Sequence, residues 1–300
     1  LDTQDSRGLI PQSNPHYVFA ARSKAMGEAD LVILLGRKLD YQLAFGSPAV
    51  FKKAKFIRIS ESPLELTDNR RGFPEILSNP GLAIEQIHNK LNKSNFDEAW
   101  ITSIKNFHLK KIHKVSTKKV KKTGDDNKIN PNMIFESLKN IIDDDFIGIA
   151  DGGDILSFAR VGLHSKYYLD SGVFGCLGIG IPYAIAASKV FKEKKIICVT
   201  GDGSFGFNAM EIDTAVRNKS NICIIISNNG GWNIEKHDQR LNYGNRVYAT
   251  SLPHCNYAAL AKSLGAHGVR VEDPDKLQKS LTEALNNTPS VVDVITSATI

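Results

Sequence analysis

Short apolar runs alternate along the chain with longer segments in which apolar residues recur every three or four positions. The short runs have the length and composition of buried strands, and the longer segments have one apolar face each, as helices do. Strands that alternate with helices pair in parallel, so the pattern predicts α/β layers. The predicted strands lie at residues 30–36, 55–60, 146–150, 195–200, 222–226 and 290–296.

Three helices are predicted to begin where Asn or Asp precedes a proline. The polar side chain can cap the helix, and proline suits its first turn. The three pairs are Asn79-Pro80, Asn130-Pro131 and Asp273-Pro274. Further helices are predicted over residues 16–29 and 181–191 and around Ile212.

The predicted elements form two blocks. Residues 1–93 hold only two strands, too few for a complete sheet, and we interpret them as a partial Rossmann-like α/β domain. Residues 130–300 hold four strands and are predicted to be a doubly wound parallel α/β domain. Residues 94–129 are predicted to be a Lys-rich linker.

The linker prediction rests on charge. The chain has a net charge of +6, and eight lysines with no acid lie between Lys105 and Lys122. The positive charge therefore belongs to one stretch, which we interpret as solvated. A non-catalytic nucleic-acid or scaffold protein that uses this stretch is the alternative. Against nucleic-acid binding, Phe107 is the one aromatic residue there that could stack on a base.

Composition argues against several classes of protein. Hydrophobic residues make up 42% and charged residues 23% of the chain, as in ordinary globular domains. No apolar run reaches the ~18 residues of a membrane span, and no signal segment opens the sequence. The four cysteines form no C-x-x-C pair, which argues against a disulfide framework or a zinc site and favours a cytoplasmic location.

Three clusters of Gly, Asp and Asn follow predicted strands of the second block. They are Asp151-Gly152-Gly153-Asp154, Gly201-Asp202-Gly203-Ser204 and Asn228-Asn229. Doubly wound domains bind ligands beyond the carboxyl ends of their strands. The three clusters are therefore the candidate binding site.

Residues 201–206 have the literal G-x-G-x-x-G form of a dinucleotide-binding loop. That fingerprint needs an acid at the end of the next strand, yet none lies between Ile222 and Asn233. Asp202 would also face the pyrophosphate, and two anions repel unless a cation lies between them. An NAD-type oxidoreductase is therefore the weaker alternative.

A bridging cation accounts for Asp202 and Asn229 together. Both offer oxygen ligands at the ends of neighbouring strands, and Mg²⁺ takes few protein oxygens and completes its shell with phosphate and water. The glycines let backbone N–H groups approach a diphosphate, beside the start of a helix. Turn and capping chemistry explains either cluster alone, but not both at neighbouring strand ends.

The chain contains Gly201-Asp202-Gly203, then 24 residues, and then Asn228-Asn229. This spacing resembles the thiamine-diphosphate (ThDP) binding motif. It is most similar to the acetolactate-synthase-like and 2-hydroxyacyl-CoA lyase group of ThDP enzymes. The similarity covers nearly the whole chain outside the lysine stretch. It implies a ThDP pyrophosphate-binding domain at 130–300 and part of a central domain at 1–93. The further matching runs are 20–23, 34–40, 151–155, 169–178 and 203–207.

The resemblance implies ligands for the cation and the diphosphate. Asp202, the Asn229 side chain and the Gly231 carbonyl would bind Mg²⁺. Gly203 and Ser204 would contact the diphosphate. The same pocket would be lined by Gly153 and Asp154.

The resemblance also implies contacts to the rest of the cofactor and to the substrate. The Gly175 carbonyl would accept a hydrogen bond from the 4′-amino group of the pyrimidine. Leu177 would hold the cofactor bent, with core packing as the alternative role. Trp232 is a candidate substrate contact or a core aromatic. Polar candidates for the pocket mouth, each with a surface position as the alternative, are Glu235, Lys236, His237 and His254.

The implied activity makes or breaks a carbon–carbon bond next to a carbonyl. The leading reaction is acetolactate-synthase-like, with decarboxylation of a 2-oxo acid followed by carboligation. A 2-hydroxyacyl-CoA lyase or an oxalyl-CoA decarboxylase is the alternative. The substrate would be a small 2-oxo acid or a 2-hydroxyacyl-CoA, with no nucleic acid or membrane involved.

The family's activating glutamate lies in a pyrimidine-binding domain on a partner subunit, and no segment here resembles that domain. No catalytic residue is therefore assigned to this chain. We expect a fragment or one subunit of a split enzyme, in a homo-oligomer or paired with a pyrimidine-domain chain. Alone, it should bind Mg²⁺ and ThDP weakly without turnover.

Central domains of this group often hold FAD, ADP or the adenine end of CoA. Arg22 matches an arginine used for such a nucleotide, with a solvated helix position as the alternative. Ser60 stands where relatives usually carry Asp. This departure counts against nucleotide binding.

Overall fold

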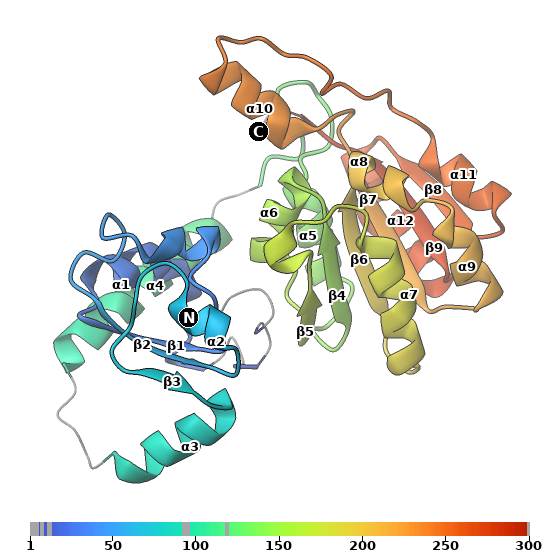
Figure 1. The fold of residues 1–300 in the computed structure, drawn as a ribbon. Helices are drawn as coiled ribbons and strands as arrows, with labels where there is room; N and C mark the ends of the chain where they lie inside the picture. Colours follow the sequence, from blue (N-terminus) through green and yellow to red (C-terminus); the bar gives the residue numbers. More distant parts are fainter. Residues whose placement is uncertain (1–5, 7–8, 11–13, 92–96, 118–119, 299–300) are drawn as a thin grey trace. The chain divides into compact units, whose positions relative to one another are not determined.

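The computed structural model describes residues 6, 9–10, 14–91, 97–117 and 120–298 (Figure 1). The chain divides into two compact units, the first within residues 12–118 and the second mainly 119–300. Each unit has its own parallel sheet. None of the helices in the described part of the chain is long and apolar enough to cross a membrane.

The first unit contains a three-stranded parallel sheet in the order β1-β2-β3. Two of its strands follow the predicted apolar runs, whereas the third has only three residues, too few to show a periodicity. The strands are β1 (Leu31–Leu35), β2 (Lys55–Ser60) and β3 (Glu75–Leu77). The helical segments are η2 (Phe19–Ala21), α1 (Arg22–Glu28), η3 (Tyr41–Gly46), α2 (Pro63–Thr67), α3 (Pro80–Lys90) and α4 (Glu98–Thr117).

Helix α4 occupies most of the segment predicted to be a linker. Ile104 is only 4% exposed and packs with Ala21 and Ala25 of the first unit. Trp100 donates its indole N–H to the Glu28 carboxylate over 3.1 Å. The prediction of a linker over 94–129 is therefore wrong for residues 98–117. Lys110 and Lys111 are exposed on this amphipathic helix, and the lysine content of the segment conceals its apolar stripe.

The second unit contains a six-stranded parallel sheet in the order β5-β4-β6-β7-β9-β8. The four inner strands follow the predicted apolar runs. The two edge strands were not predicted, because β5 is three residues long and β8 contains His267 and Arg270. The strands are β4 (Ile147–Asp151), β5 (Tyr167–Leu169), β6 (Ile196–Gly201), β7 (Ile222–Asn228), β8 (His267–Val271) and β9 (Ser290–Ile295).

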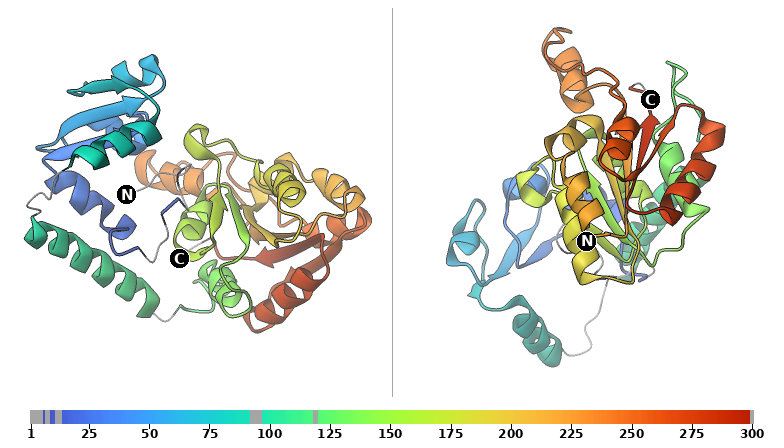
Figure 2. Two further views of the ribbon diagram at one scale, coloured as in Figure 1. Left: turned by 90° about the horizontal axis from the view of Figure 1, so that it is seen from below. Right: turned by 90° about the vertical axis from the view of Figure 1, so that its right-hand side faces the viewer.

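Helices cover both faces of this sheet (Figures 1 and 2). On one face, α5, α6 and α12 pack against the strands, and on the other α7, α9 and α11 do so. The doubly wound prediction is thereby confirmed. The helical segments are α5 (Asn132–Lys139), α6 (Asp154–Gly162), η4 (Gly172–Phe174), α7 (Gly180–Val190), α8 (Asp202–Phe207), α9 (Glu211–Arg217), α10 (Asn233–Asn242), α11 (Tyr257–Ser263) and α12 (Pro274–Asn286).

Helices begin at or just after the three predicted prolines, and two of them have the predicted side-chain cap. Asn79 accepts hydrogen bonds from the N–H groups of Gly81 and Leu82, and Asp273 accepts one from Asp275. Asn130 accepts a bond from the N–H of Asn132, where α5 begins. The helix predicted over 16–29 is shorter, since η2 and α1 cover only residues 19–28.

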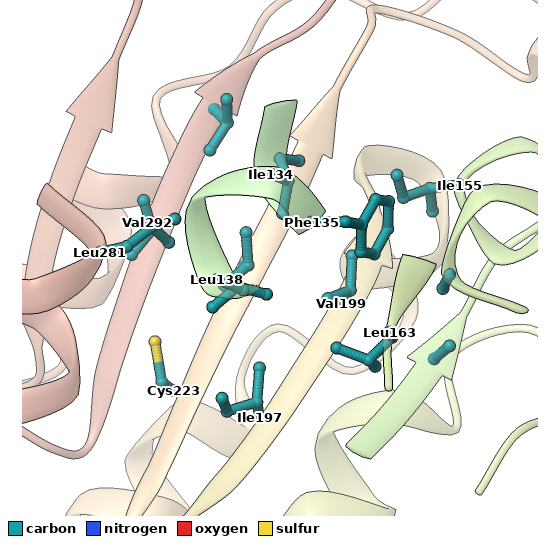
Figure 3. Packing of buried hydrophobic residues seen from close by; sticks show 14 of the residues in the cluster. Ile134, Phe135, Leu138, Ile155, Leu163, Ile197, Val199, Cys223, Leu281 and Val292 are labelled. Atoms are coloured by element: carbon teal, nitrogen blue, oxygen red, sulfur yellow. The ribbon is translucent and has the colours of Figure 1, made fainter. Parts of the chain in front are cut away.

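Alternate residues of each inner strand face opposite helical layers. Ile197 and Val199 pack with α5, α6 and α12, and Figure 3 shows this layer around Leu138. Ile196 and Cys198, on the same strand, pack with α7 on the other face. Strands buried on both faces read as continuous apolar runs, which explains why the sequence revealed them.

The strand order places the three Gly, Asp and Asn clusters together. From β4 the chain crosses to β5 at one edge and then returns to β6 on the other side of β4. The topological switch point therefore lies between β4 and β6, where doubly wound sheets bind ligands. Asp151 pairs with Thr200, and Gly201 with Ser227, so three neighbouring strands end at one level.

Truncating Ile104 tests the packing of α4. Ile104→Ala should make the first unit about 2–4 kcal/mol less stable, because it leaves a cavity beside Ala21 and Ala25. Urea unfolding followed by Trp100 fluorescence, in a Trp232→Phe background, measures this. Leu109→Ala is the matched control, since Leu109 lies on the same helix and is 61% exposed. Equal stability of the two variants would restore the linker interpretation.

Candidate functional site

A small cavity of about 50 Å³ lies at the carboxyl ends of β4, β6 and β7. All three Gly, Asp and Asn clusters contribute to its walls. Its lining includes most of the residues that the sequence predicted to contact a cofactor, a metal ion or the substrate. These are Gly153, Asp154, Leu177, Asp202, Gly203, Ser204, Asn229, Gly231 and Trp232.

Asp202 is the first residue of α8, directly after β6, and only 2% of it is exposed. Its Oδ2 accepts hydrogen bonds from the N–H groups of Gly230 and Gly231, over 3.0 and 3.1 Å. Burial raises the pKa of Asp202 to about 6, and these backbone bonds only partly offset that effect. The ionised carboxylate would gain further stabilisation from a cation.

Asn229 provides the second oxygen of the site. Its side-chain Oδ1 is buried and has no hydrogen-bond partner among the described residues, while its Nδ2 donates to Asp154 over 3.4 Å. Nearly all buried polar atoms in proteins are satisfied, so an unpaired amide oxygen indicates a missing partner. Asp202 and Asn229 line the same cavity, and their oxygens fit a hard cation such as Mg²⁺.

The cavity offers few protein ligands, as expected for a cation that keeps phosphate and water in its coordination shell. Within the described ranges, no group of three or more His, Cys, Asp or Glu side chains is arranged to hold a metal ion. A site of one carboxylate, one amide oxygen and one backbone carbonyl leaves half of an octahedron for other oxygens. Asp154 lies nearby at the start of α6, and burial raises its pKa.

Two glycines allow side chains from the segment after β7 to close the cavity. A Cβ on Gly203 would lie 2.6 Å from the Trp232 ring, and one on Gly153 would lie 2.9 Å from Ile234. Trp232 therefore forms a wall of the cavity rather than part of the hydrophobic core. It covers the same backbone that the resemblance assigns to the diphosphate.

Asp151 belongs to one of the three clusters, but the sequence predicted no role for it. Its buried carboxylate accepts hydrogen bonds from the N–H groups of Gly178 and Gly180, over 3.3 and 2.9 Å. It thereby ties the loop that carries Gly175 and Leu177 to the end of β4. Leu177 reaches the cavity, whereas Gly175 is not among its lining residues and has a left-handed φ of 62°. An acid at the end of an apolar strand was the signal available in the sequence.

The other polar candidates lie in different places. Glu235 lines the cavity, and the Lys236 amino group would lie 3.2 Å from a Cβ on Gly231. His237 is exposed on α10. His254 is exposed and is not among the residues that line the cavity, and its ring packs against the loop at Gly230.

In the first unit, Arg22 donates to the carbonyl of Gln42 over 2.5 Å. Ser60 is buried and its hydroxyl bonds to Glu65. Both residues thus have partners within their own unit.

Two family models match the chain. Residues 154–294 match the thiamine pyrophosphate enzyme, C-terminal TPP binding domain, and residues 1–87 match the thiamine pyrophosphate enzyme, central domain. The chain belongs to the thiamine pyrophosphate enzyme family. The resemblance read from the Gly-Asp-Gly and Asn-Asn clusters is thereby confirmed, and the dinucleotide interpretation of residues 201–206 finds no support in either match.

The relatives that this chain resembles include proteins named acetolactate synthase and proteins named 2-hydroxyacyl-CoA lyase. A probable acetolactate synthase of Mycobacterium bovis is 30% identical over 300 residues. 2-hydroxyacyl-CoA lyase 1 of Homo sapiens is 28% identical over 319 residues, and a 2-hydroxyacyl-CoA lyase of Saccharomyces cerevisiae is 30% identical over 316. Each alignment covers 98% of this chain and 54% of the relative, so the chain spans about half the length of these relatives.

A methyl group on Gly203 should displace Trp232. In a Trp100→Phe background, Gly203→Ala should shift the Trp232 emission to longer wavelength, because the ring must move away from the cavity wall. Gly206→Ala is the control in the same helix, since a Cβ there meets no atom within 4 Å. Identical emission spectra for the two variants would contradict the placement of Trp232.

Proposed function

We propose that this chain binds Mg²⁺ and ThDP at the ends of β4, β6 and β7. It would form the cofactor-binding part of an enzyme that makes or breaks a carbon–carbon bond next to a carbonyl. The observation that carries the proposal is the buried, unpaired Asn229 oxygen in one cavity with the buried Asp202 carboxylate. The match of residues 154–294 to a TPP-binding domain supports it.

One group of cavity residues would bind the cation, and another would bind the diphosphate. Asp202, the Asn229 side chain and the Gly231 carbonyl would hold Mg²⁺, which offsets the repulsion between a carboxylate and a diphosphate. The backbone N–H groups of Gly203 and Ser204 would contact the diphosphate. When bound, ThDP supplies the carbanion chemistry, and the protein positions and tunes it.

Asp151 would act on the pyrimidine side of the site. It holds the loop of Gly175 and Leu177 against the end of β4 through two backbone hydrogen bonds. The Gly175 carbonyl could then accept from the 4′-amino group, while Leu177 keeps the cofactor bent. Both contacts depend on a loop that is fixed before the cofactor arrives.

The reaction we favour is acetolactate-synthase-like, with decarboxylation of a 2-oxo acid and carboligation. Cleavage of a 2-hydroxyacyl-CoA is the second candidate, because relatives of both names match the chain at similar identity. Nucleotide binding by the first unit is not part of the proposal, since Arg22 and Ser60 bond within that unit. The cytoplasmic location stays a prediction.

The activating glutamate would come from another subunit or domain. The chain spans about half the length of the relatives it matches. Large apolar side chains are also exposed on segments that carry site residues, among them Phe174 at 87%, next to Gly175, and Phe207 on α8. Exposed apolar surface of this kind indicates a covering partner. We propose that a pyrimidine-binding domain covers it.

Removing either side-chain ligand tests the cofactor site. Loss of a residue that only orients a metal ligand typically lowers metal affinity about 10–100-fold. Asp202→Asn and Asn229→Ala should each weaken Mg²⁺-dependent ThDP binding by more than that, because they remove a ligand itself. Calorimetric titration of ThDP with Mg²⁺, and with a chelator in its place, measures this. Asp213→Asn, an exposed acid on α9, is the control. Variants that bind like the unmodified chain would refute the assignment.

An activity assay tests the expectation that this chain carries no catalytic residue of its own. The 300-residue chain, saturated with Mg²⁺ and ThDP, should form no acetolactate from pyruvate and cleave no 2-hydroxyacyl-CoA. The reason is that no activating glutamate is assigned to it. Colorimetric detection of acetolactate and chromatography of CoA products measure the two reactions. Turnover of either substrate would contradict this expectation and would identify the reaction.

A further inference from the structure

Asn228, which directly precedes the proposed ligand Asn229, is fully buried and uses both ends of its side chain. Its Nδ2 donates to Asp293 on β9 over 2.9 Å and to the carbonyl of Cys255 over 3.1 Å. Its Oδ1 lies 3.1 Å from His254 Nδ1. Asn228 does not line the cavity, and its side-chain bonds instead anchor the loop that follows it.

His254 contacts this loop in two ways. Its Nε2 lies 2.8 Å from the Lys128 ammonium, which can only donate, so the ring proton is on Nδ1 and is donated to Asn228. The ring also packs against Gly230, where φ is +71° and a Cβ would lie 2.9 Å from the imidazole. One side chain thus fixes both the residue before and the residue after Asn229.

The opposite side of the loop is held by Asp202, whose carboxylate accepts from the N–H groups of Gly230 and Gly231. Backbone bonds add to this, because Leu252 donates to the Gly230 carbonyl and Trp232 donates to the Thr250 carbonyl. The peptide around Gly230 therefore lies between the His254 ring and the Asp202 carboxylate. Its freedom to move depends on both.

We infer that His254 is a positioning residue for the cation, acting through Asn228 and Gly230. It holds the Asn229 amide oxygen and the Gly231 carbonyl at the spacing that the cation requires. This inference rests on the proposed function. Outer-sphere partners of this kind orient the ligands, and their loss typically lowers metal affinity about 10–100-fold.

The experiment compares His254→Ala with His254→Asn. The alanine removes the ring and the donor to Asn228, whereas asparagine can place an amide N–H close to where Nδ1 lies. His88→Ala, an exposed histidine on α3 in the first unit, is the control. Two quantities are measured on the 300-residue chain, namely Mn²⁺ affinity with ThDP by electron paramagnetic resonance, and amide exchange of residues 228–232.

We expect His254→Ala to bind Mn²⁺ about 10–100-fold more weakly. Amide exchange over residues 228–232 should be about tenfold faster in this variant, as for a local opening. Its Tm should stay close to that of the control, and His254→Asn should recover most of the Mn²⁺ affinity.

Unchanged Mn²⁺ affinity or unchanged exchange in His254→Ala overturns the inference and leaves the proposed function standing. A large loss of Tm with faster exchange throughout the second unit also overturns it, because the role of His254 would then be general stability. If the unmodified chain itself fails to bind Mn²⁺ with ThDP, the proposed function fails, and this inference fails with it.

Discussion

The Asp202 carboxylate joins the ends of two neighbouring strands, because it follows β6 and accepts hydrogen bonds from the N–H groups of Gly230 and Gly231 after β7. The group is buried, and burial raises its pKa to about 6. An ionised carboxylate in such a place needs close donors or a cation. The path of the loop after β7, and therefore the position of the Asn229 oxygen, depends on this side chain together with the contacts of His254 and the backbone bonds of Gly230.

Two further buried carboxylates organise the same edge of the sheet. Asp151 ends β4 and fixes the loop that reaches Gly180, while Asp293 on β9 accepts from Asn228 and from the N–H of Tyr257. Each of these acids binds donors that lie far away in the sequence. The sheet, buried on both faces, supplies the rigid support that such loops need if they are to hold ligands in position.

The similarity to thiamine pyrophosphate enzymes covers both units of the chain. Relatives named as acetolactate synthase and as 2-hydroxyacyl-CoA lyase match it at 28–30% identity. A pocket that serves the cofactor has the same task whichever substrate follows, so its residues carry little information on the reaction. The chemistry is the cofactor's, and the protein contributes position and electrostatics.

The sequence by itself determined the four inner strands, the capped helix starts and the meeting of the Gly-Asp-Gly and Asn-Asn clusters. Strands buried on both faces are apolar throughout, and parallel strands end at one edge. Only the tertiary structure decided the edge strand β8, helix α4 and the contacts of His254. Polar residues interrupt the pattern of β8, lysines conceal that of α4, and His254 meets Asn228 across 26 residues, a contact that no local pattern encodes.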